Sequence, residues 1–468
     1  MGSIELGICR AVASAVLVTW MIGGCGSSPG ADDVEPGGTA GEGGQTEALP
    51  GGDPVDASMD LAGGPIDPDA GLLDGPAVAP TVDPGAGAWQ PVAPQDVEEV
   101  CGLDPAMLAA ADQKLGQPWA IVRYGRLCHE YRSADMLPAE AWSATKTLGA
   151  VVTGMVAHET RELPETAPGT GPLSDMDRVD RWLPLTSYHR DARIAHVLAM
   201  VAHNPSLAPG DKTMSYDTVG SVQINSLSDV LGAAIAQDSG RLGADLEQFT
   251  QRFLFGPLGM HESTWTGGAP DKTFAFSWST TTRDMARLGL LVLNGGVWSG
   301  QRLLGEEWVH RMTHPAFEDG NTGYGYLTWL NASSNHHFGG IPGTPIGRVQ
   351  RPMSPGPCAP VALHDSYPHD PSGAPDCGYD APHTCEQRYD VGVWNAVGLG
   401  GEVIQGHPGL QIVLVGRDLD PVVFGTAGPA TIWDAVAPAV IAGDPTYAGD
   451  EAGFCEAYGS NAYAPDLR

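Results

Sequence analysis

Apolar positions after residue 100 fall into two kinds of pattern. Strand-like runs come in two pairs, one near each end of this stretch: 119–124 with 127–132, and 403–405 with 410–416. Helical spacing predicts helices over 142–156, 227–237, 243–253, 282–293, 306–312 and 430–441. Strand pairs this far apart predict one antiparallel sheet flanked by helices, with a helical subdomain inserted. This is the α+β class, an α/β sandwich.

Three further stretches complete the domain, which is expected to span 100–468. Residues 160–225 carry many prolines and turn signals and are expected to be irregular. Residues 324–331 predict one more strand. Residues 332–390 are rich in Gly, Pro, His and Cys. Because this last stretch is too long for an ordinary loop, we interpret it as an insertion.

The N-terminal part of the chain differs in composition. Residues 26–99 hold 15 Gly and 11 Pro among 74 residues, with 15 acidic residues and no Lys or Arg. Such a stretch buries too little apolar surface to offset its ordering entropy, so 25–99 is expected to be a disordered acidic tether. The whole chain has 56 acidic and 24 basic residues, a net charge of −32. That balance argues against a nucleic-acid partner and against docking on anionic lipid.

A targeting segment is expected at residues 1–24. Arg10 gives a weakly positive start, an apolar run follows over 11–22, and small residues lead to Cys25. Small residues directly before a Cys resemble a bacterial lipoprotein signal, in which that Cys is lipidated and becomes the new N-terminus. Ordinary secretion with an incidental Cys is the alternative. We expect an exported protein, lipid-anchored to a bacterial membrane on its periplasmic or cell-surface side.

An even number of cysteines in an exported domain indicates disulfides. Six remain beyond the signal: Cys101, Cys128, Cys358, Cys377, Cys385 and Cys455. We expect a Cys101–Cys128 bridge, a second bridge between two of the three insertion cysteines, and a third that reaches the last cysteine. Zinc is the rival interpretation, because His364, His369 and His383 lie nearby. No CxxC or HxxxH spacing supports it, so no metal site is expected.

One lysine carries the candidate chemistry. The chain has four lysines against 20 arginines, and only Lys146 follows a serine by three residues, in Ser143-Ala-Thr-Lys146. This spacing puts the Ser143 hydroxyl and the Lys146 amine on one face of the predicted helix. A buried lysine can lose its proton and act as a base, whereas arginine cannot. The alternative is a helix-capping serine followed by a solvated lysine.

Further motifs follow the Ser-x-x-Lys in a fixed order. They are His203-Asn-Pro-Ser-Leu, Pro209-Gly-Asp-Lys-Thr-Met-Ser-Tyr216, Leu254-Phe-Gly-Pro-Leu-Gly-Met260, Thr281-Thr-Arg-Asp-Met-Ala-Arg-Leu-Gly289, Tyr324-Gly-Tyr-Leu-Thr-Trp329 and Ala396-Val-Gly-Leu-Gly-Gly-Glu402. Together they resemble the serine β-lactamase and penicillin-binding-protein superfamily, above all its class C branch with the related esterases and 6-aminohexanoate-dimer hydrolases. The resemblance spans residues 100–445 and implies a β-lactamase/transpeptidase-like fold.

The resemblance also implies acyl transfer without a cofactor. Ser143 would attack a carbonyl and form an acyl-enzyme, and Lys146 and Tyr216 would share the role of general base. The backbone N–H groups of Ser143 and Glu402 would form the oxyanion hole. The expected partners are a small-molecule or peptide-like acyl substrate and, through the lipid anchor, a membrane; whether the protein has protein partners stays open.

Two motifs depart from the family pattern in the expected substrate-binding positions. Thr218 stands where the family's Tyr-x-Asn has Asn, and Leu399-Gly400-Gly401 stands where the family has Lys-Thr-Gly or His-x-Gly. Leu399 offers no donor to a substrate carboxylate, and the neighbouring Glu402 would repel one. These departures favour neutral esters or amides, although Arg417 could compensate for the missing cation.

Three other functions stay open at this point. The protein could be a true β-lactamase or a D-Ala-D-Ala carboxypeptidase, if another group replaces the missing cation. It could be a non-catalytic tethered binding protein on the same fold. It could also be a surface protein that binds metal through the His- and Cys-rich insertion.

Overall fold

The computed structural model describes a large part of the chain beyond residue 83. The described residues are 84–85, 87, 89–133, 137–183, 188–203, 207, 214, 216, 218–265, 273–314, 316–317, 324–330, 361–364, 384–387, 394–419 and 428–441. The chain divides into two units, Met1–Pro76 and Ala77–Arg468, and all described residues belong to the second. The expected signal, the tether up to residue 83 and Cys25 lie outside the described residues.

A six-stranded antiparallel sheet forms the centre, in the order β2-β1-β13-β12-β11-β8. Its strands are β1 (Trp119–Arg123), β2 (Arg126–Tyr131), β8 (Trp329–Leu330), β11 (Trp394–Val397), β12 (Val403–His407) and β13 (Ile412–Gly416). Both predicted hairpins are confirmed. β1 pairs along its whole length with β13, so that Trp119 lies opposite Gly416 and Arg123 opposite Ile412. The sheet therefore joins segments from both ends of the domain, as the sequence predicts.

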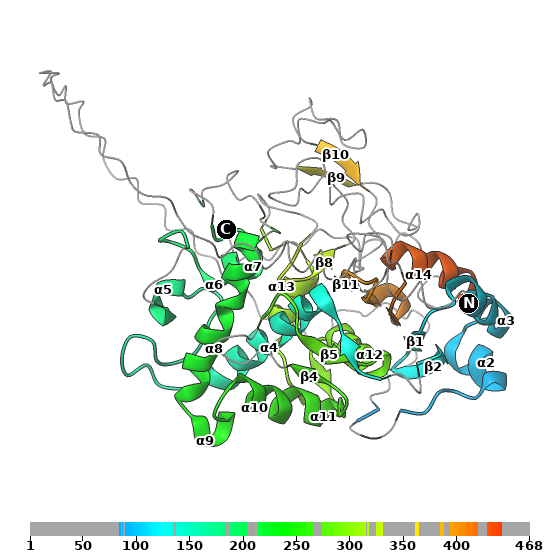
Figure 1. Cartoon of the computed structure of the whole chain (residues 1–468), viewed down its shortest axis with the longest axis horizontal. Coiled ribbons are helices and arrows are strands. Elements are labelled where there is room, and N and C mark those ends of the chain that lie inside the picture. Colours follow the sequence, from blue (N-terminus) through cyan, green and yellow to red (C-terminus); the bar gives the residue numbers. More distant parts are fainter. Residues whose placement is uncertain are drawn as a thin grey trace, which may run out of the picture. The chain divides into compact units, whose positions relative to one another are not determined.

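Helices cover both faces of this sheet (Figure 1). One face carries α2 (Val97–Cys101), α3 (Pro105–Leu115) and α14 (Gly428–Val436), and the other carries α4 (Thr145–Thr160) and α12 (Thr282–Leu293). The two layers explain why β1, β12 and β13 are buried at every position. A strand enclosed on both sides has no solvent-facing positions, so each of its side chains is either apolar or a polar group with hydrogen-bond partners inside the protein. The predicted α+β class is confirmed.

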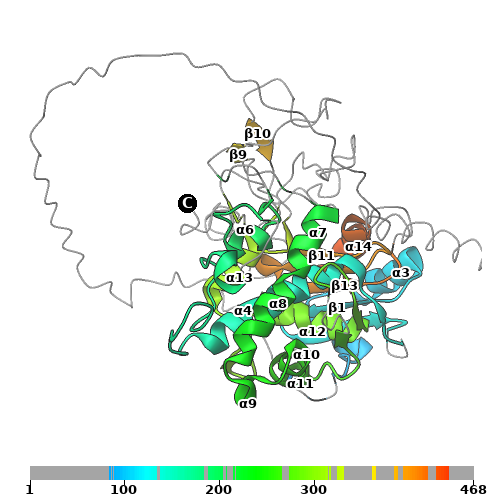
Figure 2. The same cartoon turned by 60° about the vertical axis from the view of Figure 1, so that its left-hand side comes forward.

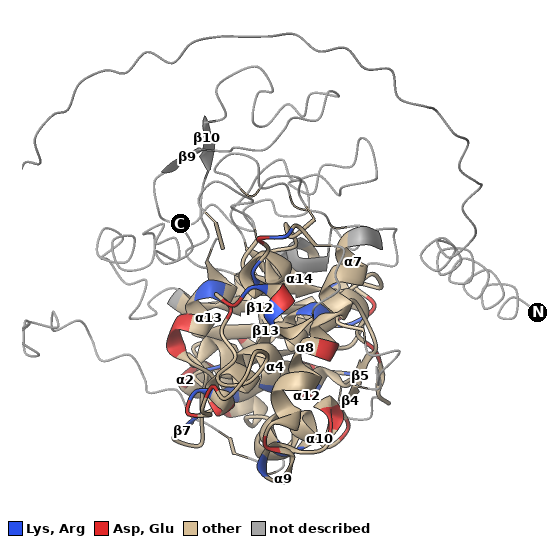
Figure 3. Ribbon diagram, turned by 90° about the vertical axis from the view of Figure 1, so that its left-hand side faces the viewer, with Lys and Arg blue, Asp and Glu red and all other residues tan. Residues whose placement is uncertain are grey.

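The remaining elements build the helical subdomain and its borders. They are α5 (Val179–Trp182), α6 (Ile194–Leu198), α7 (Thr218–Asn225), α8 (Leu227–Ala236), α9 (Ser239–Leu242), α10 (Leu246–Thr250), α11 (Gly256–Leu258), α13 (Glu306–Thr313), β3 (Ala139–Glu140), β4 (Thr264–Trp265), β5 (Trp278–Thr280), β6 (Val297–Trp298) and β7 (Gln301–Arg302). Figure 2 shows α8 beside α4, in agreement with their direct contact. Outer helices such as α9 and α13 carry charged residues (Figure 3).

Helix α4 lies at the centre of the domain, packed between the sheet and the helical subdomain. It follows a short 3₁₀ turn, η2 (Trp142–Ala144), and 13 of its 16 residues are buried. Two glycines allow neighbours to approach its backbone. A Cβ atom on Gly149 would lie 2.3 Å from the Phe274 ring, and one on Gly154 would lie 2.4 Å from Trp308. The close packing fixes the position of the helix start, where Ser143 and Lys146 lie.

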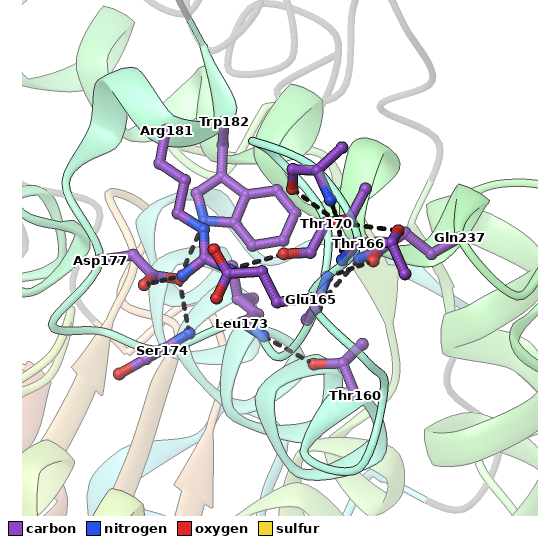
Figure 4. Close-up of polar contacts among 12 residues, drawn as sticks. Thr160, Glu165, Thr166, Thr170, Leu173, Ser174, Asp177, Arg181, Trp182 and Gln237 are labelled. Atoms are coloured by element: carbon purple, nitrogen blue, oxygen red, sulfur yellow. Dashed lines mark hydrogen bonds and ion pairs between the residues drawn. The ribbon is translucent and has the colours of Figure 1, made fainter.

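Polar contacts hold the loop between α4 and α5 in place (Figure 4). Arg181 donates from Nη1 to the Asp177 carboxylate at 2.6 Å, and the indole of Trp182 donates to the other oxygen of Asp177 at 3.0 Å. Gly171 exchanges hydrogen bonds with the side-chain amide of Gln237, on the C-terminal side of α8. These contacts anchor the first part of the 160–225 stretch to the helical subdomain. The stretch is less irregular than expected, because it contains α5, α6 and α7.

Some element boundaries differ from the expected ones. The folded part begins before residue 100, because Trp89 is 5% exposed, Val97 is 3% exposed and α2 starts at Val97. The expected boundary between tether and domain is therefore too late. The strand expected over 324–331 is confined to β8, because Leu327 has a positive φ of 47° and its N–H donates to the Leu198 carbonyl rather than to a strand. This backbone leaves the extended conformation that a strand requires.

The helix expected over 243–253 starts later and continues further. Gly243 has a φ of 111°, and the Asp245 side chain caps α10 by accepting a hydrogen bond from the Gln248 N–H. A π-helical turn (Gln251–Phe255) then leads directly into α11. Among the helices of the described residues, none combines the length and apolar character that a membrane crossing requires.

The predicted Cys101–Cys128 disulfide is confirmed. It joins the end of α2 to β2, with Cα atoms 6.1 Å apart, and so ties the entry segment to the sheet edge. Within the predicted insertion the structure describes the antiparallel strands β9 (Val361–His364) and β10 (Thr384–Gln387). Cys358, Cys377, Cys455 and the side chain of Cys385 lie outside the described part of the chain, so their pairing stays a prediction.

Candidate active site

Ser143 and Lys146 lie side by side where η2 passes into α4. The Nζ atom of Lys146 is 2.9 Å from the Oγ atom of Ser143, and it donates to the carbonyl of Ala275 at 3.0 Å. The three-residue spacing places both groups on one face of the helix start, as predicted. The hydrogen bond to the Ala275 carbonyl holds the Lys146 Nζ atom in place beside the Ser143 hydroxyl.

Burial changes the acid–base behaviour of this lysine. The residue is 3% exposed, and desolvation lowers the pKa of Lys146 to about 7. A neutral amine has one lone pair, which can accept the proton of the Ser143 hydroxyl 2.9 Å away. At neutral pH a large fraction of the molecules therefore carries a base beside the serine. A solvated lysine, the alternative interpretation from sequence, does not fit this burial.

Tyr216 completes the cluster from another segment. Lys146 Nζ lies 4.7 Å from the centre of the Tyr216 ring, and the Tyr216 hydroxyl is hydrogen-bonded to the side chains of Ser143 and Trp329. Burial raises the pKa of Tyr216 to about 12, and these two hydrogen bonds offset part of the rise. The tyrosine is therefore protonated at neutral pH. This state favours Lys146 as the base and Tyr216 as a relay of the proton.

Aromatic side chains from the 324–329 segment surround Tyr216. Its ring centroid lies 5.1 Å from that of Trp329 and 6.4 Å from that of Tyr324, with the Tyr324 ring edge-on. These contacts exclude water from one side of the cluster and strengthen its polar interactions. The 324–329 motif therefore forms an aromatic wall around Tyr216, a role that its sequence pattern alone did not predict.

Asn225 is a site residue that sequence reasoning missed. Its side-chain oxygen, at the end of α7, accepts a hydrogen bond of 3.1 Å from the Ala275 N–H. The main chain of Ala275 is therefore held at its N–H by Asn225 and at its carbonyl by Lys146. No spacing in the sequence signals this contact, since Asn225 is nine residues beyond the Tyr216 motif and 50 residues before its partner.

The turn over 398–402, which contains Leu399-Gly400-Gly401, lies against the segment that leads into Ser143. A Cβ atom on Gly398 would come within 2.4 Å of the Ala141 carbonyl oxygen, two residues before Ser143. The turn closes through a hydrogen bond of 2.7 Å from the Gly398 N–H to the Glu402 carbonyl, and Gly401 has a φ of 87° that favours glycine. The structure thus brings the expected oxyanion-hole segment beside Ser143. The role of the two N–H groups stays a prediction.

The side chain of Glu402 folds back into this turn. It is 2% exposed and accepts a hydrogen bond of 2.9 Å from the Gly400 N–H. Desolvation raises the pKa of Glu402 to about 7, although the charge of Arg417 opposes the rise. A substantial share of the carboxyl is therefore neutral at pH 7, and the repulsion expected against an anionic substrate depends on pH.

The guanidinium of Arg417 is buried and bonded to main-chain carbonyls rather than available to a substrate. It is 2% exposed and donates to the backbone carbonyls of Thr280 and Glu140. These contacts therefore do not support Arg417 as a replacement for the missing substrate-binding cation.

Leu399 is half-buried in the turn, and Thr218 begins α7, although the side chain of Thr218 lies outside the described part. Their substrate-binding roles stay predictions. The described residues hold no cluster of three or more His, Cys, Asp or Glu placed to bind a metal.

Comparisons with known proteins find similarity among solved structures alone. No protein-family model and no curated protein matches the sequence. Solved structures to which the chain is similar include a β-lactamase from Mycobacterium bovis (15% identity, TM-score 0.41, covering 71% of this chain and 98% of the other). They also include a family VIII carboxylesterase (11%, 0.43, 72% and 99%) and a penicillin-binding protein from Bacillus halodurans (12%, 0.39, 71% and 99%). These are the kinds of protein that the motifs resemble; the similarity assigns no activity to this chain.

The lowered pKa of Lys146 predicts a pH dependence. The value of kcat/KM for a neutral ester should rise about tenfold per pH unit on the acid side and level off near pH 7, where Lys146 has lost its proton. Lys146→Arg should abolish the activity, because arginine stays protonated. Initial rates between about pH 5 and pH 9 measure the profile.

Glu402 titrates in the same range and needs its own control. Glu402→Gln keeps a side-chain oxygen that can accept from the Gly400 N–H but removes the titration. The acid limb should persist in this variant. Disappearance of the limb in Glu402→Gln would assign it to Glu402 instead of Lys146. A flat profile in the wild type would contradict a base that titrates near pH 7.

Proposed function

We propose that this protein is an exported serine hydrolase that acts on ester or amide bonds through an acyl-enzyme. The observation that carries the proposal is the buried Lys146 amine, 2.9 Å from the Ser143 hydroxyl, with a pKa of about 7. A base of this strength beside a serine is what nucleophilic catalysis at neutral pH requires. A merely tethered binding protein has no need to bury an amine in this way.

The proposed reaction has two halves. In the first, neutral Lys146 takes the proton of Ser143 as its Oγ atom attacks the substrate carbonyl. The proton then passes through Lys146 and Tyr216 to the leaving alcohol or amine, which departs as the ester to Ser143 forms. In the second half the same groups remove a proton from water as its oxygen attacks the acyl carbon. They return that proton to the Ser143 Oγ atom as the bond to the acyl group breaks and the acid departs. The backbone N–H groups of Ser143 and Glu402 stabilise the negative oxygen in both halves.

The preferred substrates in this proposal are neutral. Leu399 provides no charged donor for a carboxylate, and Arg417 is committed to two backbone carbonyls behind the site. Loss of one charge-assisted hydrogen bond costs about 1.5–3 kcal/mol, or one to two powers of ten in affinity. β-Lactams and D-Ala-D-Ala peptides carry such a carboxylate, so a β-lactamase or carboxypeptidase activity is the less favoured candidate.

A substrate comparison tests this proposal. Short-chain p-nitrophenyl esters should be hydrolysed with a higher kcat/KM than the cephalosporin nitrocefin, and Ser143→Ala should abolish both activities while the circular dichroism spectrum is unchanged. Nitrocefin hydrolysis at the level of dedicated β-lactamases would overturn the preference. Ester hydrolysis that survives in Ser143→Ala would overturn the mechanism.

We also propose that the enzyme works while anchored to a bacterial membrane through lipid on Cys25, on the periplasmic or cell-surface side. The support is the apolar segment before Cys25 and the acidic Gly- and Pro-rich stretch after it. In a bacterial host, radiolabelled palmitate should be incorporated into the wild type and not into Cys25→Ser. Equal labelling of both forms, or a wild type recovered entirely from the soluble fraction, would contradict the anchor.

A further inference from the structure

The Glu140 carboxylate makes two backbone contacts next to the candidate site. Glu140 ends β3, three residues before Ser143, and is half-buried. Its Oε1 atom accepts a hydrogen bond of 3.1 Å from the Trp142 N–H and one of 2.7 Å from the Ser277 N–H. One oxygen atom therefore links the backbone of its own segment, at Trp142, to that of Ser277, which lies 137 residues beyond Glu140.

Both of its partners have an unusual backbone conformation. The φ angle is 50° at Trp142 and 95° at Ser277. Residues other than glycine rarely adopt this left-handed backbone region, because their Cβ atom comes too close to a neighbouring carbonyl oxygen. Such a conformation persists only where surrounding contacts enforce it. The Glu140 carboxylate supplies one such contact to each of the two residues.

Each of these residues sets the position of a reacting group. Trp142 directly precedes Ser143, so its backbone angles aim the nucleophile. Ser277 ends the 273–277 bend, in which the Ala275 carbonyl accepts the hydrogen bond of 3.0 Å from Lys146 Nζ. The carboxylate thus connects the backbone that carries the nucleophile to the backbone that holds the base.

We propose that Glu140 is a positioning residue, which keeps Ser143 and Lys146 in reacting geometry by holding the left-handed backbone of Trp142 and Ser277. The inference rests on the proposed hydrolase function and adds a residue to its machinery. The hydrogen bonds that the Glu140 side chain accepts come from the two peptide N–H groups, so it acts through them. An error of about 1 Å in such geometry can cost a hundredfold in rate.

Other contacts hold the surrounding strands without this carboxylate. The Ala141 N–H donates to the Trp278 carbonyl at 2.7 Å, and the Trp278 N–H donates to the Thr145 hydroxyl at 3.2 Å. Arg417 donates to the main-chain carbonyl of Glu140 rather than to its side chain. Removal of the carboxylate is therefore expected to release two peptide groups and to leave the pairing of β3 with β5.

Three variants test the proposal with a p-nitrophenyl ester as substrate. Glu140→Ala removes the acceptor, and Glu140→Gln keeps an oxygen at the same place. Glu130→Ala is the matched control, because Glu130 is also a half-buried carboxylate that accepts two side-chain donors, Ser133 at 2.6 Å and Arg283 at 2.9 Å, away from the site. We expect kcat to fall about 10- to 100-fold in Glu140→Ala with little change in KM, and to stay within about fivefold in Glu140→Gln. Glu130→Ala should keep the wild-type kcat per folded molecule.

Amide hydrogen exchange gives a second readout that does not depend on activity. The amide protons of Trp142 and Ser277 should exchange at least about tenfold faster in Glu140→Ala than in the wild type, and Glu140→Gln should restore their protection. If Glu140→Ala does not fold, Glu140→Asp replaces it, because the shorter side chain withdraws the oxygen by one methylene. The same order of effects is expected.

The outcomes separate this inference from the function on which it rests. A wild type that hydrolyses esters together with a fully active Glu140→Ala overturns the role of Glu140 alone, as does unchanged exchange at Trp142 and Ser277. A drop in kcat that Glu130→Ala reproduces reduces Glu140 to a stabilising residue and also overturns the proposal. A wild type inactive on every ester overturns the proposed function and this inference with it.

Discussion

The burial of one amine is the constraint on which the rest of the site depends. Water stabilises the charged form of a lysine, so enclosing Lys146 removes most of that stabilisation and lowers its pKa to about 7. A neutral amine can act as a base only on a group within hydrogen-bond distance, and the Ser143 Oγ atom lies 2.9 Å from Lys146 Nζ. Burial of Lys146 lowers the free energy of unfolding at every pH below the ordinary pKa of lysine, because the unfolded chain then binds the proton more tightly than the folded one. In return, the site contains a neutral base at physiological pH.

The architecture meets this constraint with parts from distant segments. The η2 turn supplies Ser143 and the start of α4 supplies Lys146, and the neighbouring elements enclose them. The 273–277 bend offers the Ala275 carbonyl, the loop before α7 contributes the Tyr216 ring, and the turn before β12 lies on Ala141. The antiparallel sheet brings that turn to the nucleophile, since β11 and β12 form its hairpin. The central sheet therefore positions one half of the site and the helical subdomain the other.

Local patterns in the sequence were sufficient for the two hairpins, for several helices and for part of the site, but not for α5 to α7 or for the extent of α10 and β8. The hairpins and α12 follow from periodicity, and Ser143 with Lys146 follows from spacing on one helix face. Glu140 and Asn225 could not be found in this way, because their partners lie 137 and 50 residues away and meet them only after β3 pairs with β5 and α7 packs on the bend. The left-handed Leu327 was equally invisible, since tertiary hydrogen bonds rather than residue type hold it.

The most direct test of this account is a titration of the lysine side chains by NMR. The chain has only four lysines, so ¹³Cε labelling gives few signals, and the signal lost in Lys146→Arg identifies the residue of interest. The account predicts that this signal titrates near pH 7, well below an ordinary lysine pKa of about 10.4. A Lys146 signal that titrates near pH 10 in the folded protein would contradict it, because the amine beside Ser143 would then be charged and unable to act as the base.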